Sequence, residues 1–301
     1  MQYVNEINHH LNIYYVIELL KNATQTSSIK ALNSEVTENI LLEPILNYLP
    51  KSELLSNPLI NIYYQTYILI NNDDEVNFDN LVKNLKKYEN LFSFIDINNL
   101  YKIIINYCVK KHNQNIIKYR IAGFELYIYA LNKKFLYDYE HITRFIFSNV
   151  VTLGIRLNRL KDVEKFIKKY NIYIESEFRA ITLAFNQAKL FYAKQEYNKA
   201  IKILMTHQFK DILWNLNMKH LLLKIYYEIN ELDLLKSNLK AFKSYVKRKN
   251  NIGYHQTYFK NIARAFDTLI KFKEHPQKFN KYTLDSNTPD YEWFSKMYAI
   301  K

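Results

Sequence analysis

Glycine, proline and cysteine are all scarce in this chain of 301 residues, which contains three glycines, five prolines and one cysteine. Average usage would be roughly 7% glycine and 5% proline. Because the three glycines are isolated from one another, no glycine-rich phosphate loop and no nucleophile-elbow motif occurs. A sheet of many short strands would need a turn residue every ~8–12 positions. The scarcity therefore predicts an all-α chain whose helices are joined by short polar loops.

The single cysteine, Cys108, excludes a disulfide within the chain, and its neighbours in the run YKIIINYCV predict a buried thiol. The first twenty residues lack the basic start and the small-residue cleavage site of a secretion signal. Apolar runs are interrupted well short of the ~18 continuous residues that a membrane span needs. We therefore expect a cytoplasmic protein that does not enter a membrane.

Residue patterns that carry catalysis or bind metal ions are missing as well. The eight histidines are scattered, no H-E-x-x-H occurs, and Cys108 with His112 offers only two metal ligands on one helix. The sequence thus predicts no metal site, no cofactor and no enzymatic activity.

Basic residues are abundant, and the formal net charge is +13. Such a charge is compatible with an acidic protein or a nucleic acid as partner. It is also what AT-rich codons produce, since lysine, asparagine, isoleucine and tyrosine are all frequent. Only seven of the 42 basic residues are arginine, the residue that binds phosphate and guanine in a fixed bidentate geometry. The total charge therefore says less than its local clustering.

Apolar residues recur at helical spacing along most of the chain. Single helices are predicted over about 3–21 and 36–49, from Pro58 through Leu69, and over 78–92 and 255–272. Helix pairs are predicted at 96–112 with 116–132, 141–157 with 161–170, 177–193 with 197–206, and 212–229 with 233–249. The polar stretch 22–35 is predicted to be a loop or a short helix. Asp96, Asp162 and Asp211 are expected at helix starts, where a carboxylate accepts backbone N–H groups.

The helix pairs recur every ~34–45 residues, a range typical of tetratricopeptide and HEAT repeats. Such units stack because none of them can bury its apolar face alone. We therefore expect one repeat array over residues 1–272. The tail, 273–301, contains two prolines and an aromatic segment, which predicts a polar loop and a helix that caps the array; the alternative is a segment that inserts into a partner.

One stretch, residues 184–204, resembles a tetratricopeptide repeat. Small, aromatic and large residues stand where that family places them, at Ala188, Phe191, Tyr197, Ala200 and Leu204. The flanking pairs depart from the pattern, for instance at Phe166, where a small residue is expected. The order of segments over residues 3–272 is also similar to a family of uncharacterised bacterial helical-repeat proteins. These resemblances imply a right-handed α-solenoid of stacked antiparallel helix pairs and bring no activity with them.

The residues 234–264 form a basic strip, with eight basic side chains and no acidic one. Its candidate partner-binding residues are Lys236, Lys240, Lys243, Lys247, Arg248 and Lys249. Four of the lysines recur at helical spacing on one face, where like charges repel by roughly 0.2–0.5 kcal/mol per pair. An anionic partner would relieve this repulsion, but a solvated helix face in a lysine-rich protein is the simpler explanation of the strip.

In the tetratricopeptide register, the first helix of the 184–204 unit lines a concave groove and presents Lys189 and Tyr192 to it. Grooves of this kind hold extended or helical peptides, and a lysine in one can bind a carboxylate; the simpler alternative for Lys189 is a packing or solvated role. The sequence therefore favours a non-enzymatic scaffold that binds a protein or peptide partner. The alternative is binding of nucleic acid or another polyanion through the basic strip.

Overall fold

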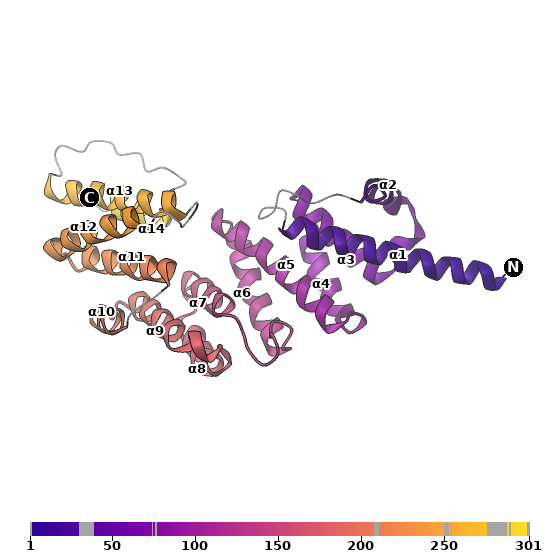
Figure 1. Ribbon diagram of the computed structural model, residues 1–301, viewed down its shortest axis with the longest axis horizontal. Helices are drawn as coiled ribbons and strands as arrows, with labels where there is room; N and C mark the ends of the chain where they lie inside the picture. Colours follow the sequence, from indigo (N-terminus) through magenta and orange to yellow (C-terminus); the bar gives the residue numbers. More distant parts are fainter. Residues whose placement is uncertain are drawn as a thin grey trace. The chain divides into compact units, whose positions relative to one another are not determined.

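The computed structural model of the chain is all-α (Figure 1). It describes every residue except 1, 30–38, 74, 76, 208–210, 250–252, 254, 276–287, 289, 300 and 301. Within the described part no strand is formed, and a single isolated bridge joins Asp138 and His141. The prediction of an all-α chain is thus confirmed.

Fourteen α-helices are present in the described residues. They are α1 (Gln2–Ile29), α2 (Leu42–Tyr48), α3 (Pro58–Asn72), α4 (Phe78–Tyr88), α5 (Phe94–Asn113), α6 (Ile117–Asn132), α7 (Arg144–Arg156), α8 (Leu160–Tyr170), α9 (Ser176–Ala193), α10 (Tyr197–Thr206), α11 (Ile212–Glu228), α12 (Leu232–Arg248), α13 (His255–Glu274) and α14 (Tyr291–Ala299). The predicted helices agree closely with these. One expectation was wrong in part, because α1 continues into the polar stretch 22–35 as far as Ile29; residues 30–38 lie outside the described part of the chain.

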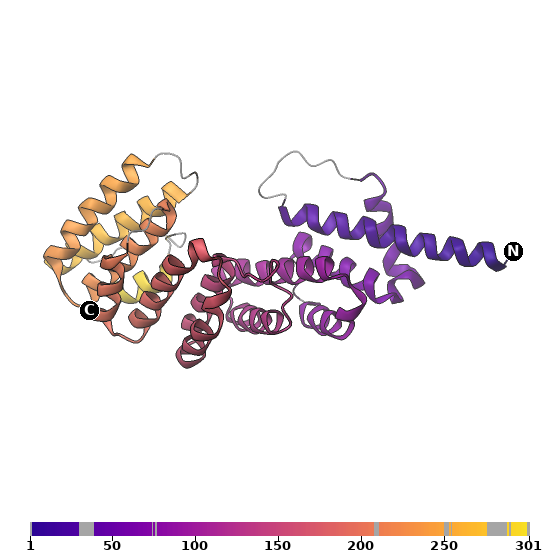
Figure 2. The ribbon, with the colours of Figure 1, turned by 60° about the horizontal axis from the view of Figure 1, so that its bottom comes forward.

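The helices gather into two compact units, Met1–Ile146 and Phe147–Lys301, and α7 crosses the boundary in sequence. In the first unit α3 packs against α1, α4 and α5, and α5 packs against α6. In the second unit α9 packs against α11, and α11 packs against α13 (Figure 2). The division of the chain into an array over 1–272 and a tail over 273–301 stays a prediction.

Four helix pairs are joined by the same kind of turn. In each, one residue after the first helix adopts a left-handed conformation: Asn115, Asn158, Gln195 and Asn230, with φ of 65°, 56°, 60° and 62°. Crossed backbone hydrogen bonds accompany the turn; Gln195 N donates to Tyr192 O and Glu196 N to Phe191 O, both at 2.9 Å. This arrangement satisfies the last carbonyl groups of the helix. The same local geometry therefore recurs from pair to pair.

Three helix starts carry the expected aspartates. Asp211 accepts hydrogen bonds from Leu213 N and Trp214 N at the start of α11, as expected. Asp96 lies in the first turn of α5, where Ser93 provides the capping oxygen, and Asp162 lies in the first turn of α8. The three carboxylates thus stand where the positive end of the helix dipole favours them.

The small residues of the 184–204 stretch lie where α9 and α10 pack together. Ala188 and Ala200 are fully buried where α9 packs against α10, and Leu204 is buried beside them. Phe191 and Tyr197 are partly buried against the same core. Small side chains allow two helices to approach, and the larger ones fill the space beside them.

The first unit buries several polar side chains within its own helices. Cys108 is completely buried, as expected, and burial raises the pKa of its thiol to about 12. Lys111 is buried with its ammonium 2.7 Å from Asp73 and 2.5 Å from Glu75. Among the described helices of both units, none is long and apolar enough to cross a membrane.

Candidate functional site

Three helices of the second unit present polar side chains at the same register. These side chains are Thr152 in α7, Lys189 in α9 and Lys224 in α11. Each lies six residues before the left-handed residue in the turn that joins the two helices of its pair. Lys189 Nζ donates to Thr152 Oγ1 across 2.5 Å. Because successive first helices pack side by side, equivalent positions on them form one row, which we call the polar row.

Asp290, directly before α14, binds two cations of this region. Arg156 Nη2 donates to one carboxylate oxygen at 3.2 Å, and Lys224 Nζ donates to the other at 3.0 Å. Arg156 also lies 3.7 Å from Glu292. The side chain of Lys224 is 12% exposed and that of Asp290 is 25% exposed. Partial exclusion of water strengthens such a pair relative to one on an open surface.

The pKa values reflect this crowding of charge. Burial by itself would raise the pKa of Asp290, but the Lys224 ammonium, followed by His220 and Arg156, holds it well below its usual range. Burial lowers the pKa of Lys189 to about 8; Asp290 opposes this shift, while Arg156 and Lys224 add to it. Arg156 and Lys224 therefore pair with Asp290, Lys189 lies within the electrostatic influence of the same carboxylate, and this cationic environment favours an anion.

His220 of α11 is buried beside Asp290. Its Nε2 lies 3.8 Å from the nearer carboxylate oxygen and has no hydrogen-bond partner. Burial lowers the pKa of His220 to about 4, Asp290 opposes the shift, and Lys224 reinforces it. The imidazole is therefore neutral near pH 7, and it leaves a buried polar atom available at the site.

The close contact of Lys189 with Thr152 does not have the geometry of a nucleophile and its base. Thr152 Oγ1 donates its hydrogen to Ser148 O at 2.7 Å within α7, so its lone pair accepts from the Lys189 ammonium. A catalytic hydroxyl would instead have to donate its proton to a neutral amine. Lys189 is consequently positioned as a cation that can bind an anionic group.

A second carboxylate, Glu228 at the end of α11, accepts three hydrogen bonds. Its Oε1 accepts from Tyr192 and, at 2.5 Å, from Trp293 Nε1, and its Oε2 accepts from Tyr197 at 2.6 Å. The tyrosines belong to α9 and α10, whereas Trp293 belongs to α14. Glu228 thus links the end of the polar row to the C-terminal helix.

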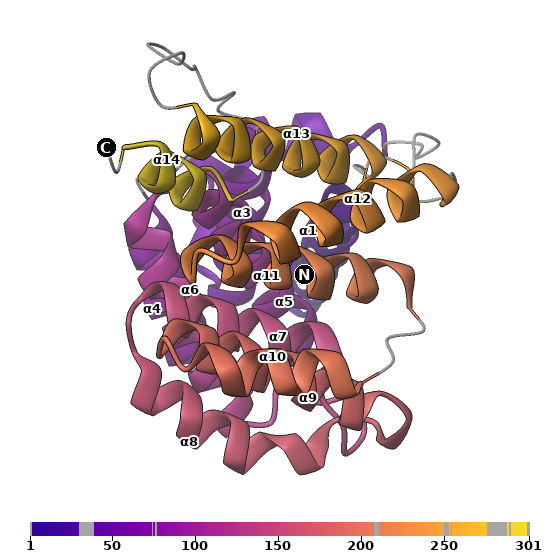
Figure 3. The same ribbon diagram turned by 90° about the vertical axis from the view of Figure 1, so that its left-hand side faces the viewer.

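Apolar contacts complete the seating of α14, which lies close to α11 and α13 (Figure 3). Phe294 is fully buried, with its ring 5.1 Å from that of Phe266 and stacked at 6.5 Å over His220. Trp293 packs edge-on against Tyr227 at 5.7 Å. The aromatic segment therefore supplies the apolar part of the contact, and Asp290 supplies the charge.

The predicted site residues fall in two separate places. Lys189 and Tyr192 lie at the polar row and at its Glu228 end. The other six lie on α12 or directly after it: Lys236, Lys240, Lys243, Lys247, Arg248 and Lys249. Of these six, Lys236, Lys240 and Lys243 border a shallow groove of about 500 Å³ between α12 and α13.

The basic strip is partly compensated by its neighbouring helix. Lys236 lies 2.5 Å from Glu274 and Lys243 lies 2.5 Å from Asp267, both acids being on α13. The sequence stretch 234–264 contains no acidic residue, but the two acids follow just beyond its end. Helix packing places them opposite the lysines, which sequence proximity alone did not indicate. Lys240, Lys247 and Arg248 are exposed.

Sequence reasoning missed Arg156, His220, Lys224 and Asp290. A signal for Lys224 was present, since aligning the helix pairs on their turn residues places it level with Lys189. No comparable signal marks Asp290, because the tail has no repeat register. Its role follows only from where α14 packs.

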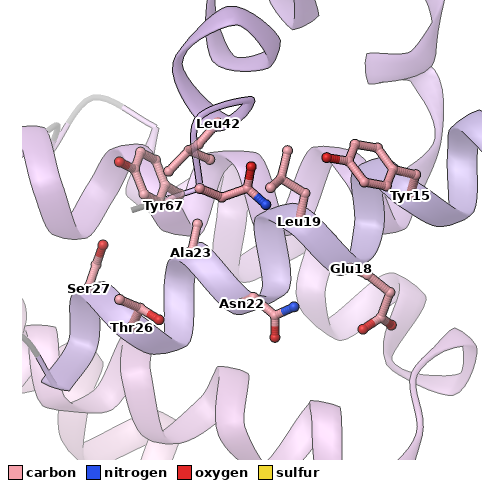
Figure 4. A pocket seen from close by; sticks show the side chains of 10 residues that line it. Tyr15, Glu18, Leu19, Asn22, Ala23, Thr26, Ser27, Leu42 and Tyr67 are labelled. Atoms are coloured by element: carbon pink, nitrogen blue, oxygen red, sulfur yellow. The ribbon is translucent and has the colours of Figure 1, made fainter. Parts of the chain in front are cut away.

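The first unit has a pocket of about 200 Å³ beside α1, which Figure 4 shows. Tyr15, Leu19 and Asn22 of α1 line it together with Leu42 and Tyr67. Its acidic residue, Glu18, pairs with Lys21 at 3.2 Å. This pocket does not gather cations around one carboxylate, as the polar row does.

Comparisons of the chain with protein-family models, with curated proteins and with solved structures found no significant match. The candidate site therefore rests on its geometry. That geometry combines three cations, two carboxylates and an apolar wall, and the segment from Asp290 through α14 contacts both a cation pair and the Glu228 carboxylate. Groups arranged in this way recognise a ligand by charge and shape.

Proposed function

We propose that the chain is a non-enzymatic scaffold whose second unit binds an acidic peptide or protein segment along the polar row. The observation that carries the proposal is that three successive first helices bring Arg156, Lys189 and Lys224 together, with Arg156 and Lys224 paired directly with the Asp290 carboxylate. Charge-assisted hydrogen bonds to a carboxylate are among the stronger polar contacts in proteins. A peptide presenting such a group would gain them on a preformed surface, which keeps the entropic cost of binding low.

The proposal includes a tetratricopeptide-like right-handed solenoid, with α7, α9 and α11 lining its concave face. Three features support it: the recurring left-handed turn, the small residues between α9 and α10, and the contacts of α9 with α11 and of α11 with α13. In a stacked array of this kind, the first helices of the pairs form a continuous surface for an elongated ligand.

Binding of nucleic acid through α12 is the second candidate. The exposure of Lys240, Lys247 and Arg248 favours it, whereas the pairing of Lys236 and Lys243 with acids on α13 reduces the charge that is available. Such binding would weaken log-linearly with salt concentration.

A peptide-display selection against the full chain tests the proposal. We expect acidic peptides to be enriched, and we expect their binding to fall at least about tenfold when Lys189→Glu and Lys224→Glu are combined. The matched control combines Lys240→Glu and Lys247→Glu on α12, with folding of both variants checked by circular dichroism. If peptide binding is lost in the α12 variant and kept in the polar-row variant, the polar row is not the binding site. Loss of single-stranded DNA binding in the α12 variant would establish the second candidate.

A further inference from the structure

The C-terminal segment lies where the proposed ligand would bind. Resting on the proposed function, we infer that Asp290 and α14 act as an internal ligand of the polar row. The external partner presents the same three side chains. It is a helix-forming acidic peptide with an aspartate, a tryptophan three residues after the aspartate and a phenylalanine directly after the tryptophan. Each of these three side chains contacts a different set of residues beside the polar row.

The aspartate position is defined by charge. Asp290 stands just before α14, and its backbone carbonyl accepts from Trp293 N at 2.9 Å and from Phe294 N at 3.1 Å. Its side chain is therefore free of the helix backbone and extends to Arg156 and Lys224. Any helix that begins in this way presents a carboxylate to the two cations while its own first turn stays intact.

The tryptophan position requires the indole N–H as a hydrogen-bond donor and the face of the indole ring as a contact for a cation. Trp293 Nε1 donates to Glu228, and the Lys224 ammonium lies 5.1 Å from the ring centres of both Tyr192 and Trp293. An ammonium at that distance is attracted to the faces of aromatic rings. Phenylalanine in this place would keep the ring and lose the hydrogen bond, so the site distinguishes the two residues.

The phenylalanine position is the apolar anchor. Phe294 is fully buried against Phe266 and His220. Because residues three and four positions apart face the same side of a helix, one helical turn delivers the aspartate, the tryptophan and the phenylalanine to the same surface.

The internal ligand does not use all the polar groups of the site. Lys189 donates to Thr152, and His220 Nε2, which is buried within 3.8 Å of Asp290, has no hydrogen-bond partner. A partner that engages either group would bind with more contacts than the tail does. Such a partner replaces the tail when its additional contacts outweigh the advantage that tethering gives the tail.

The test measures competition in the full chain. The probe is a fluorescein-labelled peptide with the sequence of residues 288–299, and its binding is followed by anisotropy. We expect weak binding to the unmodified chain and about tenfold tighter binding to the Asp290→Asn variant, because the internal competitor has lost its charge-assisted contacts. Asp267→Asn, the same chemical change at the Lys243 pair on α13, is the control and should leave the affinity unchanged.

A second measurement guards against a variant that merely unfolds. Hydrogen exchange of α14 in the unmodified chain should accelerate at saturating unlabelled peptide, while exchange of α5 in the first unit stays constant. A peptide with asparagine for the aspartate, or with phenylalanine for the tryptophan, should compete several-fold more weakly.

Three outcomes would overturn the inference. The first is equal peptide affinity for the Asp290→Asn variant and the unmodified chain, and the second is unchanged exchange in α14. The third is a dimer of the chain that the free peptide dissociates, which would assign the surface to the tail of a second copy. The peptide-display result would still decide the proposed function, since it depends on the polar row and not on the identity of the tail.

Discussion

Each unit of the molecule binds a glutamate through three donors, and the comparison of the two clusters separates structure from function. In the first unit Glu89 accepts from Tyr101 at 3.4 Å, Tyr129 at 2.8 Å and Lys133 at 2.8 Å. These donors come from α5, α6 and the residue after α6, so the cluster joins helices that are consecutive in the chain. Its carboxylate is buried by the helices that it holds together.

In the second unit the corresponding glutamate, Glu228, takes one of its three donors from outside the consecutive helices. Tyr192 and Tyr197 belong to the neighbouring pair, but Trp293 lies 65 residues further along. The Asp290 contacts have the same character. A cluster completed by a distant tail can exchange that part for an external ligand, whereas the Glu89 cluster cannot do so without separating its own helices.

The largest expected change in stability comes from removing the glutamate of the Glu89 cluster. Glu89→Ala should lower the free energy of unfolding by about 3 kcal/mol, because it leaves the phenol groups of Tyr101 and Tyr129 without their buried acceptor; Lys133 is half exposed and adds little. Urea denaturation followed by circular dichroism measures this. Glu228→Ala, the matched change in the second unit, should cost less and should instead accelerate hydrogen exchange in α14. If the two variants lose equal stability and α14 is unaffected, the distinction between the clusters is wrong.

The next effect is a dependence of stability on pH, which we expect from His220 in the second unit. The folded-state pKa of His220 is about 4, against an ordinary value of 6.5, so between these values the unfolded state binds more protons. Stability therefore falls as the pH is lowered, by about 2 kcal/mol between pH 7 and pH 5 for this group alone. Asp290 and Lys224 are the charged groups that face it, and Asp290, whose pKa is held well below its usual range, keeps its charge in this window.

Replacing the histidine isolates its contribution. His220→Phe should show a smaller loss of stability between pH 7 and pH 5 than the unmodified chain, as measured by urea denaturation at each pH. An identical loss in both proteins would mean that the buried imidazole does not titrate as described.

A smaller effect is expected at the turns. Gln195 has a φ of 60°, which costs a residue with a Cβ roughly 1 kcal/mol relative to glycine. Gln195→Gly should therefore raise the free energy of unfolding by about 1 kcal/mol in thermal or urea denaturation. Asn230→Gly should gain only a few tenths, since asparagine tolerates this conformation. Equal gains at both positions would contradict the argument.

The same turns show how far the sequence could predict the structure. Helices and most of their ends followed from apolar periodicity and capping residues, which act within a few positions along the chain. Lys189 and Tyr192 were predicted from the register of a single repeat. Asp290 and Trp293 were not, because their partners are reached through the packing of α14, and nothing local in the tail specifies which carboxylate will meet Arg156 and Lys224.

The basic strip provides the smallest effect and the sharpest contrast with the polar row. The Lys243 ammonium pairs with Asp267, but their side chains are 45% and 38% exposed, so solvent screens the pair. Lys243→Ala should change the free energy of unfolding by no more than about 0.5 kcal/mol, and 0.5 M salt should remove even that difference. A loss above 1 kcal/mol that persists in salt would show that α12 and α13 depend on this pair. The strip would then have to be regarded as part of the structure, and its lysines would no longer be available as a surface for a polyanion.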